Sequence, residues 1–202
     1  MLSQLSTLKA RLNIADADTQ YDDLLTSALA ATSAMFEKEC NRTFSRTVDT
    51  TYEFDSDDLE LVPPIYPIES VSKFETKENE ADGWIEQTDV EFLIRKNCII
   101  SLKSQLPVPT FSSGGGSASA LARITYTGGY VLPGDTVGTG QAALPSDLEQ
   151  AAIEQAASWF MNRDKLGVTR YWPKGGIYLG FLKTYLLPNV RSTLDRYQRM
   201  QF

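Results

Sequence analysis

Apolar residues recur with helical spacing at both ends of the chain and with a period of two in the middle. Near the N-terminus, three leucines on one helical face predict a short helix near residues 4–12. A longer helix is predicted over 19–40, where Asp18 or Thr19 would cap the free N–H groups of the first turn. One apolar stripe runs along this helix. Its members are Tyr21, Leu24, Leu25, Ala28, Met35 and Phe36, with Thr32 interrupting them.

The stretch from about 44 to 131 has the pattern of short strands. Alternation in "VDTTYEF" predicts a strand with Val48, Thr50, Tyr52 and Phe54 on one face. After the turn "DSDD", "LELV" predicts a returning strand, and "PPIYPI" an extended connector or an edge, because proline has no N–H to donate. Further strands are predicted for "VSKFETK", "VEFLIR", "CIISL" and "ARITYTG", and a flexible loop for "SSGGGS". Together these strands indicate an antiparallel sheet or a small barrel.

Helical spacing returns over 146–165, where Ser146 and Glu149 fit a capping box. Gly167 is a plausible stop for this helix. A last helix is predicted over 189–199, after a proline and with a narrow apolar stripe. The residues of the first of these helices that we expect to face the core are Leu148, Ala152, Trp159 and Phe160.

These patterns predict an α+β fold with two parts. A small helical core is expected from residues 1–43 and 141–202, and a mostly antiparallel, β-rich insertion from residues 44–140. Residues 188–202 form a C-terminal tail within the helical part.

Composition excludes several classes of enzyme and partner. The 202 residues include no histidine, so a Ser-His-Asp or Cys-His centre is excluded. The net charge of −7 argues against a protein that grips nucleic-acid phosphates. No apolar run is long enough to cross a membrane, and the N-terminus does not resemble a signal peptide. The two cysteines, Cys40 and Cys98, are expected to be reduced core residues.

Two motifs resemble ligand sites but lack their chemistry. Gly128 and Gly129 follow a predicted strand, yet no lysine follows them at P-loop spacing and no helix begins there. We therefore expect them to turn the chain back toward the helical part, with positive φ. "DADTQYDD" has Asp16 and Asp18, but Tyr21 stands where a calcium loop needs glycine. The sequence thus predicts no cofactor and no metal, and helix capping accounts for the acidic residues.

Two groups of residues are candidates for interfaces. Four aromatic residues in a late irregular segment indicate either packing over the helical core or a subunit interface, where aromatic residues are enriched. They are Tyr171, Trp172, Tyr178 and Phe181. The thin apolar stripe of the C-terminal helix indicates either a frayed amphipathic end or a docking helix that orders on a partner. The docking helix is favoured, because so narrow a stripe buries little on its own. The candidate docking residues are Val190, Arg191, Leu194, Arg196, Tyr197, Arg199 and Phe202.

The order of these elements resembles a known family. The opening "LSTLKARLNIADADTQYDDLLTSALAATSAMFEKECNRTF" ends in an E-x-x-x-N-R-x-F segment, formed by Glu37, Asn41, Arg42 and Phe44. "YEFD", "PPIYPIESV", "ITYTGGYV" and "LPSDLEQAAIEQAASWFMNRDKLG" follow in order. In this arrangement the chain resembles the tailed-phage head–tail connector (adaptor) family, including its gp6-like and phiE125 gp8-like groups. The resemblance covers most of the chain.

The resemblance implies a structural virion protein and no enzyme. Members form a ring, usually of twelve copies, under the capsid portal at the neck of the virion, after assembly in the host bacterial cytoplasm. The ring extends the channel through which double-stranded DNA passes without specific binding, and it carries the stopper or tail-completion protein. The family's C-terminal segment docks on the portal, a position that residues 188–202 match. Two other readings remain: a virion accessory or glycan-binding module using the β-rich insertion, and a histidine-free hydrolase with paired carboxylates.

Overall fold

The computed structural model describes residues 1–77, 80–81, 83–103, 106, 121–163, 170–171, 179–180 and 186–199. The chain divides into two compact units. We call them the helical unit (Met1–Cys40, Leu132–Gly134 and Leu144–Gln198) and the β unit (Asn41–Val131, Asp135–Ala143 and Arg199). In the part of the chain that the structure describes, four α-helices and several antiparallel sheets confirm the predicted α+β class.

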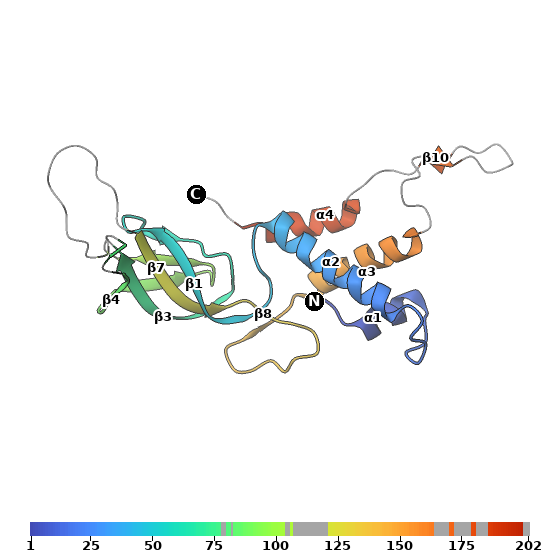
Figure 1. Ribbon diagram of the computed structural model, residues 1–202, viewed down its shortest axis with the longest axis horizontal. Helices are drawn as coiled ribbons and strands as arrows, with labels where there is room; N and C mark the ends of the chain where they lie inside the picture. The colour runs from blue at the N-terminus through green and yellow to red at the C-terminus, as the bar shows by residue number, and fades with distance from the viewer. Residues whose placement is uncertain are drawn as a thin grey trace. The chain divides into compact units, whose positions relative to one another are not determined.

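The helical unit consists of α1 (Leu5–Leu12), α2 (Asp22–Cys40), α3 (Ser146–Met161) and α4 (Pro188–Leu194). A 3₁₀ turn, η2 (Asp195–Tyr197), follows α4, and Figure 1 shows α2 and α3 as the two long helices. One apolar cluster joins α1, α2 and α3. Its buried members are Leu8, Leu25, Leu29, Ile153, Ala156 and Ala157.

All four predicted helices are present, but their starts differ from the capping patterns. Helix α2 begins only at Asp22, because Asp18 instead accepts the N–H of Gln20 in a turn of its own. The predicted capping box of α3 is wrong, since Ser146 is already helical and Pro145 occupies the cap position. Helix α3 ends at Met161, short of the predicted 165, and Gly167 lies outside the described residues.

The predicted stripe of α2 is only partly correct. Leu25, Met35 and Phe36 are buried as expected, and so is Leu29, which the pattern left out. Leu24 is instead 46% exposed. Along α3, Leu148 and Ala152 are buried as predicted, whereas Trp159 and Phe160 are only half-buried.

A buried lysine fixes the connection between α1 and α2. Lys9 is 3% exposed, and its Nζ lies 2.5 Å from Oδ1 of Asp22 in the first turn of α2. The same Nζ donates to the carbonyl of Asp16 at 3.1 Å. The acidic residues of "DADTQYDD" therefore serve the folded chain directly, because one of them neutralises a buried cation.

The β unit contains two antiparallel sheets around one core. The first has the order β1 (Thr47–Asp55), β7 (Leu121–Gly128), β3 (Ile68–Lys77), β4 (Ile85–Gln87), and Figure 1 shows β1, β7 and β3 side by side. The second has the order β2 (Glu60–Leu61), β6 (Ile99–Leu102), β5 (Phe92–Arg95). Buried residues of both sheets form one cluster, including Phe54, Phe74, Ile100, Ile124 and Tyr126.

Two short pairings complete the described strands. Strand β8 (Tyr130–Val131) pairs in parallel with β9 (Ala142–Ala143). Strands β10 (Arg170–Tyr171) and β11 (Leu179–Gly180) pair antiparallel. The predicted loop "SSGGGS" lies outside the described residues.

Two details of the β unit differ from the sequence pattern. Strand β2 was expected to return beside β1, but it pairs with β6. In β1 a bulge at Asp49, whose φ is +50°, shifts the register between Thr47 and Thr50. Because a bulge adds one residue, Val48 falls out of phase with Tyr52 and Phe54 and is 55% exposed.

Both cysteines are buried and neither forms a disulfide, as expected. Cys40 closes α2, and its thiol donates to the carbonyl of Leu194 at 3.6 Å. Cys98 lies directly before β6, in the turn after Arg95. Among the described residues, no helix is both long and apolar enough to cross a membrane.

Arg42 anchors the segment that leads from α2 into β1. Its side chain is 4% exposed, and its guanidinium carbon lies 3.2 Å from the ring centroid of Tyr66 and 4.8 Å from that of Phe44. Its Nη2 also donates to the carbonyl of Tyr66. The preceding residue, Asn41, has a φ of +49°, so the chain turns sharply just before this cluster. The N-R-x-F part of the motif thus has a packing role in the β unit.

The Gly128–Gly129 pair lies where three backbone segments meet. Gly129 has the predicted positive φ, +102°, whereas the positive φ expected at Gly128 is wrong. The N–H of Gly129 donates to the carbonyl of Pro67 at 2.8 Å. A Cβ on Gly129 would lie 2.6 Å from the carbonyl oxygen of Ser45, and one on Gly128 2.8 Å from that of Pro67. Backbone packing therefore accounts for both glycines.

Substituting Gly129 by alanine should destabilise the protein by about 2–4 kcal/mol, because the new methyl group meets backbone and the positive φ is strained. Gly140→Ala is the matched control, since Gly140 also has a positive φ, +82°, but nothing lies within 4 Å of its Cβ position. Urea unfolding should show a loss of about 1 kcal/mol for that control. Equal losses for the two variants would contradict the close backbone contact.

Candidate assembly surfaces

Helix α4 is fixed in the helical unit from its first residue onward. Gln155, which is 1% exposed on α3, accepts the N–H of Leu187 at 3.0 Å, directly before the helix begins. Val190 is fully buried and Leu194 is 2% exposed. The interpretation that this stripe buries little on its own is therefore wrong, because it completes the chain's own core. Of the docking candidates on α4, only Arg191 is exposed.

Beyond Leu194 the contacts of the chain become polar. Asp147, in the first turn of α3, accepts the hydroxyl hydrogen of Tyr197 at 2.6 Å through Oδ1. Its Oδ2 lies 3.2 Å from Nη2 of Arg196. Oδ1 also accepts the N–H of Leu148 at 2.9 Å. One carboxylate thus holds two consecutive residues of the C-terminal segment.

Arg199 belongs to the β unit and is bound there by uncharged acceptors. Its Nε donates to the carbonyl of Val62 at 2.9 Å, and its Nη2 donates to the hydroxyl of Tyr52 at 3.2 Å. The Tyr52 ring centroid lies 5.5 Å from the guanidinium carbon. Burial raises the pKa of the neighbouring Tyr126 to about 12, so its hydroxyl, which accepts the N–H of Ile65, stays neutral. The last docking candidate, Phe202, lies outside the described residues.

One of the four aromatic candidates for a subunit interface lies within the described residues. Tyr171 lies on the short strand β10. Trp172, Tyr178 and Phe181 lie outside the described residues.

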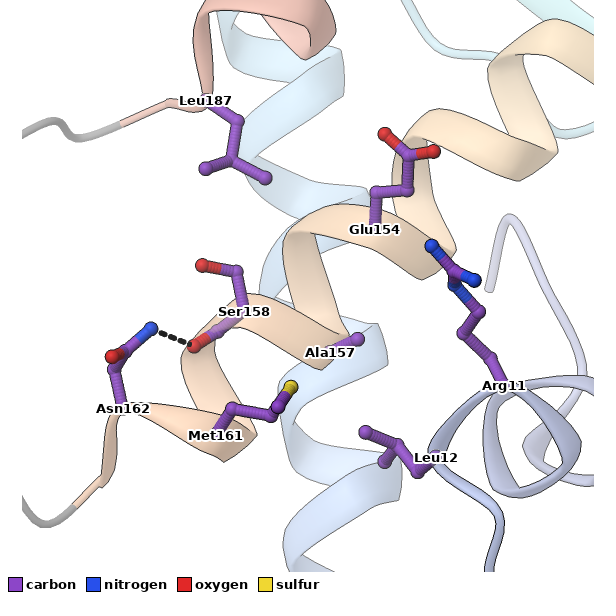
Figure 2. Close-up of a pocket in the computed structure, with 8 residues that line it drawn as sticks. All are labelled: Arg11, Leu12, Glu154, Ala157, Ser158, Met161, Asn162 and Leu187. Atoms are coloured by element: carbon purple, nitrogen blue, oxygen red, sulfur yellow. Dashed lines mark hydrogen bonds between the residues drawn. The ribbon is translucent and has the colours of Figure 1, made fainter.

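A groove of about 640 Å³ opens on the helical unit between the end of α1, the second half of α3 and the residue before α4. Figure 2 shows Leu12 and Met161 pointing toward one another across it, with Ala157 between them. Met161 is 68% exposed, the largest value among the exposed apolar residues of the described chain. The groove is lined by Arg11, Leu12, Glu154, Ala157, Ser158, Met161, Asn162 and Leu187.

The outer face of the larger sheet carries a network of charges. Glu75 on β3 is 4% exposed, and its two oxygens lie 2.6 Å from Nε of Arg123 and 2.9 Å from Nζ of Lys73. The Arg123 hydrogen bond, reinforced by Lys73, lowers the pKa of Glu75 below its usual 4.5. Trp84 packs on this network, with the Arg123 guanidinium 4.2 Å from its ring centroid. The ring of Trp84 is therefore already in contact with a side chain of the sheet.

The acidic motifs do not gather into an ion site in the part of the chain that the structure describes, which contains no cluster of three or more metal-ligating side chains. Sequence reasoning missed Asp147 and the groove around Met161. No pattern marks them, because each depends on residues distant in the sequence that meet only in the folded unit.

Solved structures with a similar fold come from gene transfer agent particles. The chain is similar to one in the neck of an empty gene transfer agent (GTA) particle, computed with C6 symmetry, at 16% identity and a TM-score of 0.57. It is also similar to a chain in the neck of the native particle, computed with C12 symmetry, at 16% identity and a TM-score of 0.56. Each match covers 98% of this chain and 89% of the other.

A third similar chain belongs to the virion of the native gene transfer agent particle, at 15% identity and a TM-score of 0.57. This match again covers 98% of this chain and 89% of the other. The sequence matches no protein-family model and no curated protein. At this level of identity the three likenesses establish a shared fold across both units.

Replacing Asp147 by asparagine should loosen residues 195–199 without unfolding the helices, because it removes the charge that Arg196 meets. Hydrogen exchange of these amides should accelerate several-fold, while that of α2 and α3 stays unchanged. Asp195→Asn is the matched control, since Asp195 is exposed and its contact is a 3.5 Å hydrogen bond from Gln198. Unchanged exchange in the Asp147 variant would show that this carboxylate does not hold the segment.

The lowered pKa of Glu75 predicts a pH dependence of stability. Its contribution is fully present above pH 4.5, the usual pKa of the unfolded group, and is lost as pH falls through the lower folded value. The free energy of unfolding should therefore fall more steeply below pH 4.5 for the wild type than for Glu75→Gln. Thermal unfolding from pH 6 to pH 3 measures this, and parallel curves would contradict the role of the Arg123–Glu75 pair.

Proposed function

We propose that the protein is a structural neck component of a phage-like particle: a head–tail adaptor that forms a ring under the capsid portal. The observation that carries this proposal is the shared fold over 98% of the chain with neck components, one of them in a twelve-fold symmetric neck. The match extends over both the helical unit and the β unit. The order of sequence motifs that resembles the connector family supports the same role independently.

In this role the ring extends the DNA channel and carries a stopper or tail-completion protein. The net charge of −7 suits such a channel, because a wall with excess negative charge does not hold DNA phosphates. DNA then passes without a specific binding site. The location is the neck of the virion, with assembly in the host bacterial cytoplasm.

The C-terminal segment contacts the portal in this proposal. Val190 and Leu194 are committed to the chain's own core, so the exchangeable part begins after Leu194. Arg196, Tyr197 and Arg199 are held there by hydrogen bonds and one ion pair. We therefore assign docking to residues 195–202, with α4 as the anchor that fixes them to the helical unit. The exposed Arg191 of α4 remains available as a further contact.

The role is structural rather than enzymatic. A chain without histidine lacks the usual general base near neutral pH. A glycan-binding role for the β unit has less support, because Arg123 already covers the ring of Trp84.

Two measurements test the proposal. Native mass measurement of the protein, alone and mixed with the portal protein, should show a ring, either alone or only on the portal. Deleting residues 195–202 should leave a folded protein with unchanged helical circular dichroism that no longer joins heads to tails. Deleting residues 188–202 is a useful contrast, because it should also destabilise the core by removing Val190 and Leu194. Tailed, infectious particles from the shorter deletion would overturn the docking role.

A further inference from the structure

One side of α2 is exposed although it bears no charged side chain over most of its length. From Leu24 to Phe36 the helix contains no charged residue. A helix with so little charge around its circumference is normally covered on all sides. Within the described residues, the covered side is the one that bears Leu25, Leu29 and Phe36. The exposed positions in this stretch are Leu24, Ser27, Ala30, Ala31 and Ala34.

The groove on the other side of the unit has a mixed lining. Leu12, Ala157 and Met161 form an apolar strip within it, whereas Arg11, Glu154, Ser158 and Asn162 make much of the remaining lining polar (Figure 2). The carboxylate of Glu154 accepts hydrogen bonds from Gln150 and Asn189. Arg11 is exposed and forms no ion pair with any residue that the structure describes.

The two surfaces face in opposite directions at the same end of the unit. Leu25 and Leu29 of α2 pack on Ile153 and Ala156 of α3, so the exposed side of α2 points away from α3. Seen from the groove, α2 lies behind α3 (Figure 2). Tyr21 contacts Phe160 with ring centroids 5.3 Å apart, which brings the start of α2 level with the end of α3.

Charge also matches between the two surfaces. Asp23 directly precedes Leu24 and is exposed, and within the described ranges it forms no ion pair. The carboxylate of Asp23 beside the exposed Leu24 on one surface therefore corresponds to the guanidinium of Arg11 beside the apolar strip of the groove on the other. Because the two surfaces are different, contact between copies is head-to-tail, which forms a ring when the rotation from one copy to the next closes.

We propose that the groove formed by Leu12, Ala157 and Met161 receives the start of α2 from a second copy of this chain. Leu24 of one copy enters the groove beside Met161 of the next, and Asp23 pairs with Arg11 across the contact. The exposed alanines permit close approach of the two helices. This inference rests on the proposed ring and identifies its subunit contact.

A double cysteine variant, Leu24→Cys with Met161→Cys, tests the contact directly in the assembled protein, alone or on the portal. Oxidation should produce a ladder of covalent oligomers, and each single variant should produce none. Dimers from a single variant would indicate a two-fold contact and overturn the head-to-tail arrangement. Lys38→Cys with Met161→Cys is the matched control, because Lys38 is exposed at the far end of α2 and should not cross-link. The native cysteines are buried and do not interfere.

Charge reversal gives a second, independent readout. Asp23→Arg and Arg11→Asp should each weaken assembly about tenfold, and combining them should restore most of it. A ring that forms by mass measurement but shows neither the ladder nor the rescue overturns this contact and leaves the adaptor role intact. Absence of any ring, alone or on the portal, overturns both.

Discussion

The packing of α2 on α3 is the interaction on which the helical unit depends. Leu25 and Leu29 meet Ile153 and Ala156 with almost no exposed surface, and α1 contributes Leu8 to the same cluster. Burying each such side chain contributes about 1.5–3 kcal/mol, so these contacts outweigh any single polar contact at the edge of the unit. They also orient the remaining surfaces, because fixing one side of α2 determines which side stays exposed.

The sequence predicted the helices well because their apolar spacing is local. It failed where the partner of a group lies far along the chain. Ser146 and Glu149 have the spacing of a capping box, but Pro145 already begins the turn and Ser3 donates to Glu149 at 3.4 Å. Strand β2 pairs with β6 rather than β1, because residues of both sheets pack into one shared core. The alternation of residues within a single strand does not show which strand will be its partner.

The candidate interface was predictable only in part for the same reason. The sequence predicted that the narrow stripe of the last helix would bury little surface. The spacing of three apolar residues does not show which other residues pack around them. In the fold, Val190 and Leu194 are enclosed, and Cys40 of α2 donates to the carbonyl of Leu194. No sequence motif marks Asp147 as a contact residue, because Tyr197, whose hydroxyl hydrogen it accepts, lies 50 residues away in the sequence. An acidic residue in the first turn of a helix is normally explained by its favourable interaction with the helix dipole alone.

The strength of the contacts changes along the C-terminal segment at Leu194, from buried apolar packing before it to polar contacts after it. Exposing Val190 and Leu194 would cost about 1.5–3 kcal/mol for each side chain, which favours keeping α4 in place in any assembly. The Arg196–Asp147 pair has side-chain exposures of 65% and 40%, and such solvent-exposed pairs contribute only about 0–1 kcal/mol. Arg199 is held by a carbonyl and a hydroxyl, which a partner's carboxylate would replace with a stronger, charge-assisted hydrogen bond. The chain therefore has a fixed apolar anchor and, directly after it, a segment held by polar contacts with Asp147, Val62 and Tyr52.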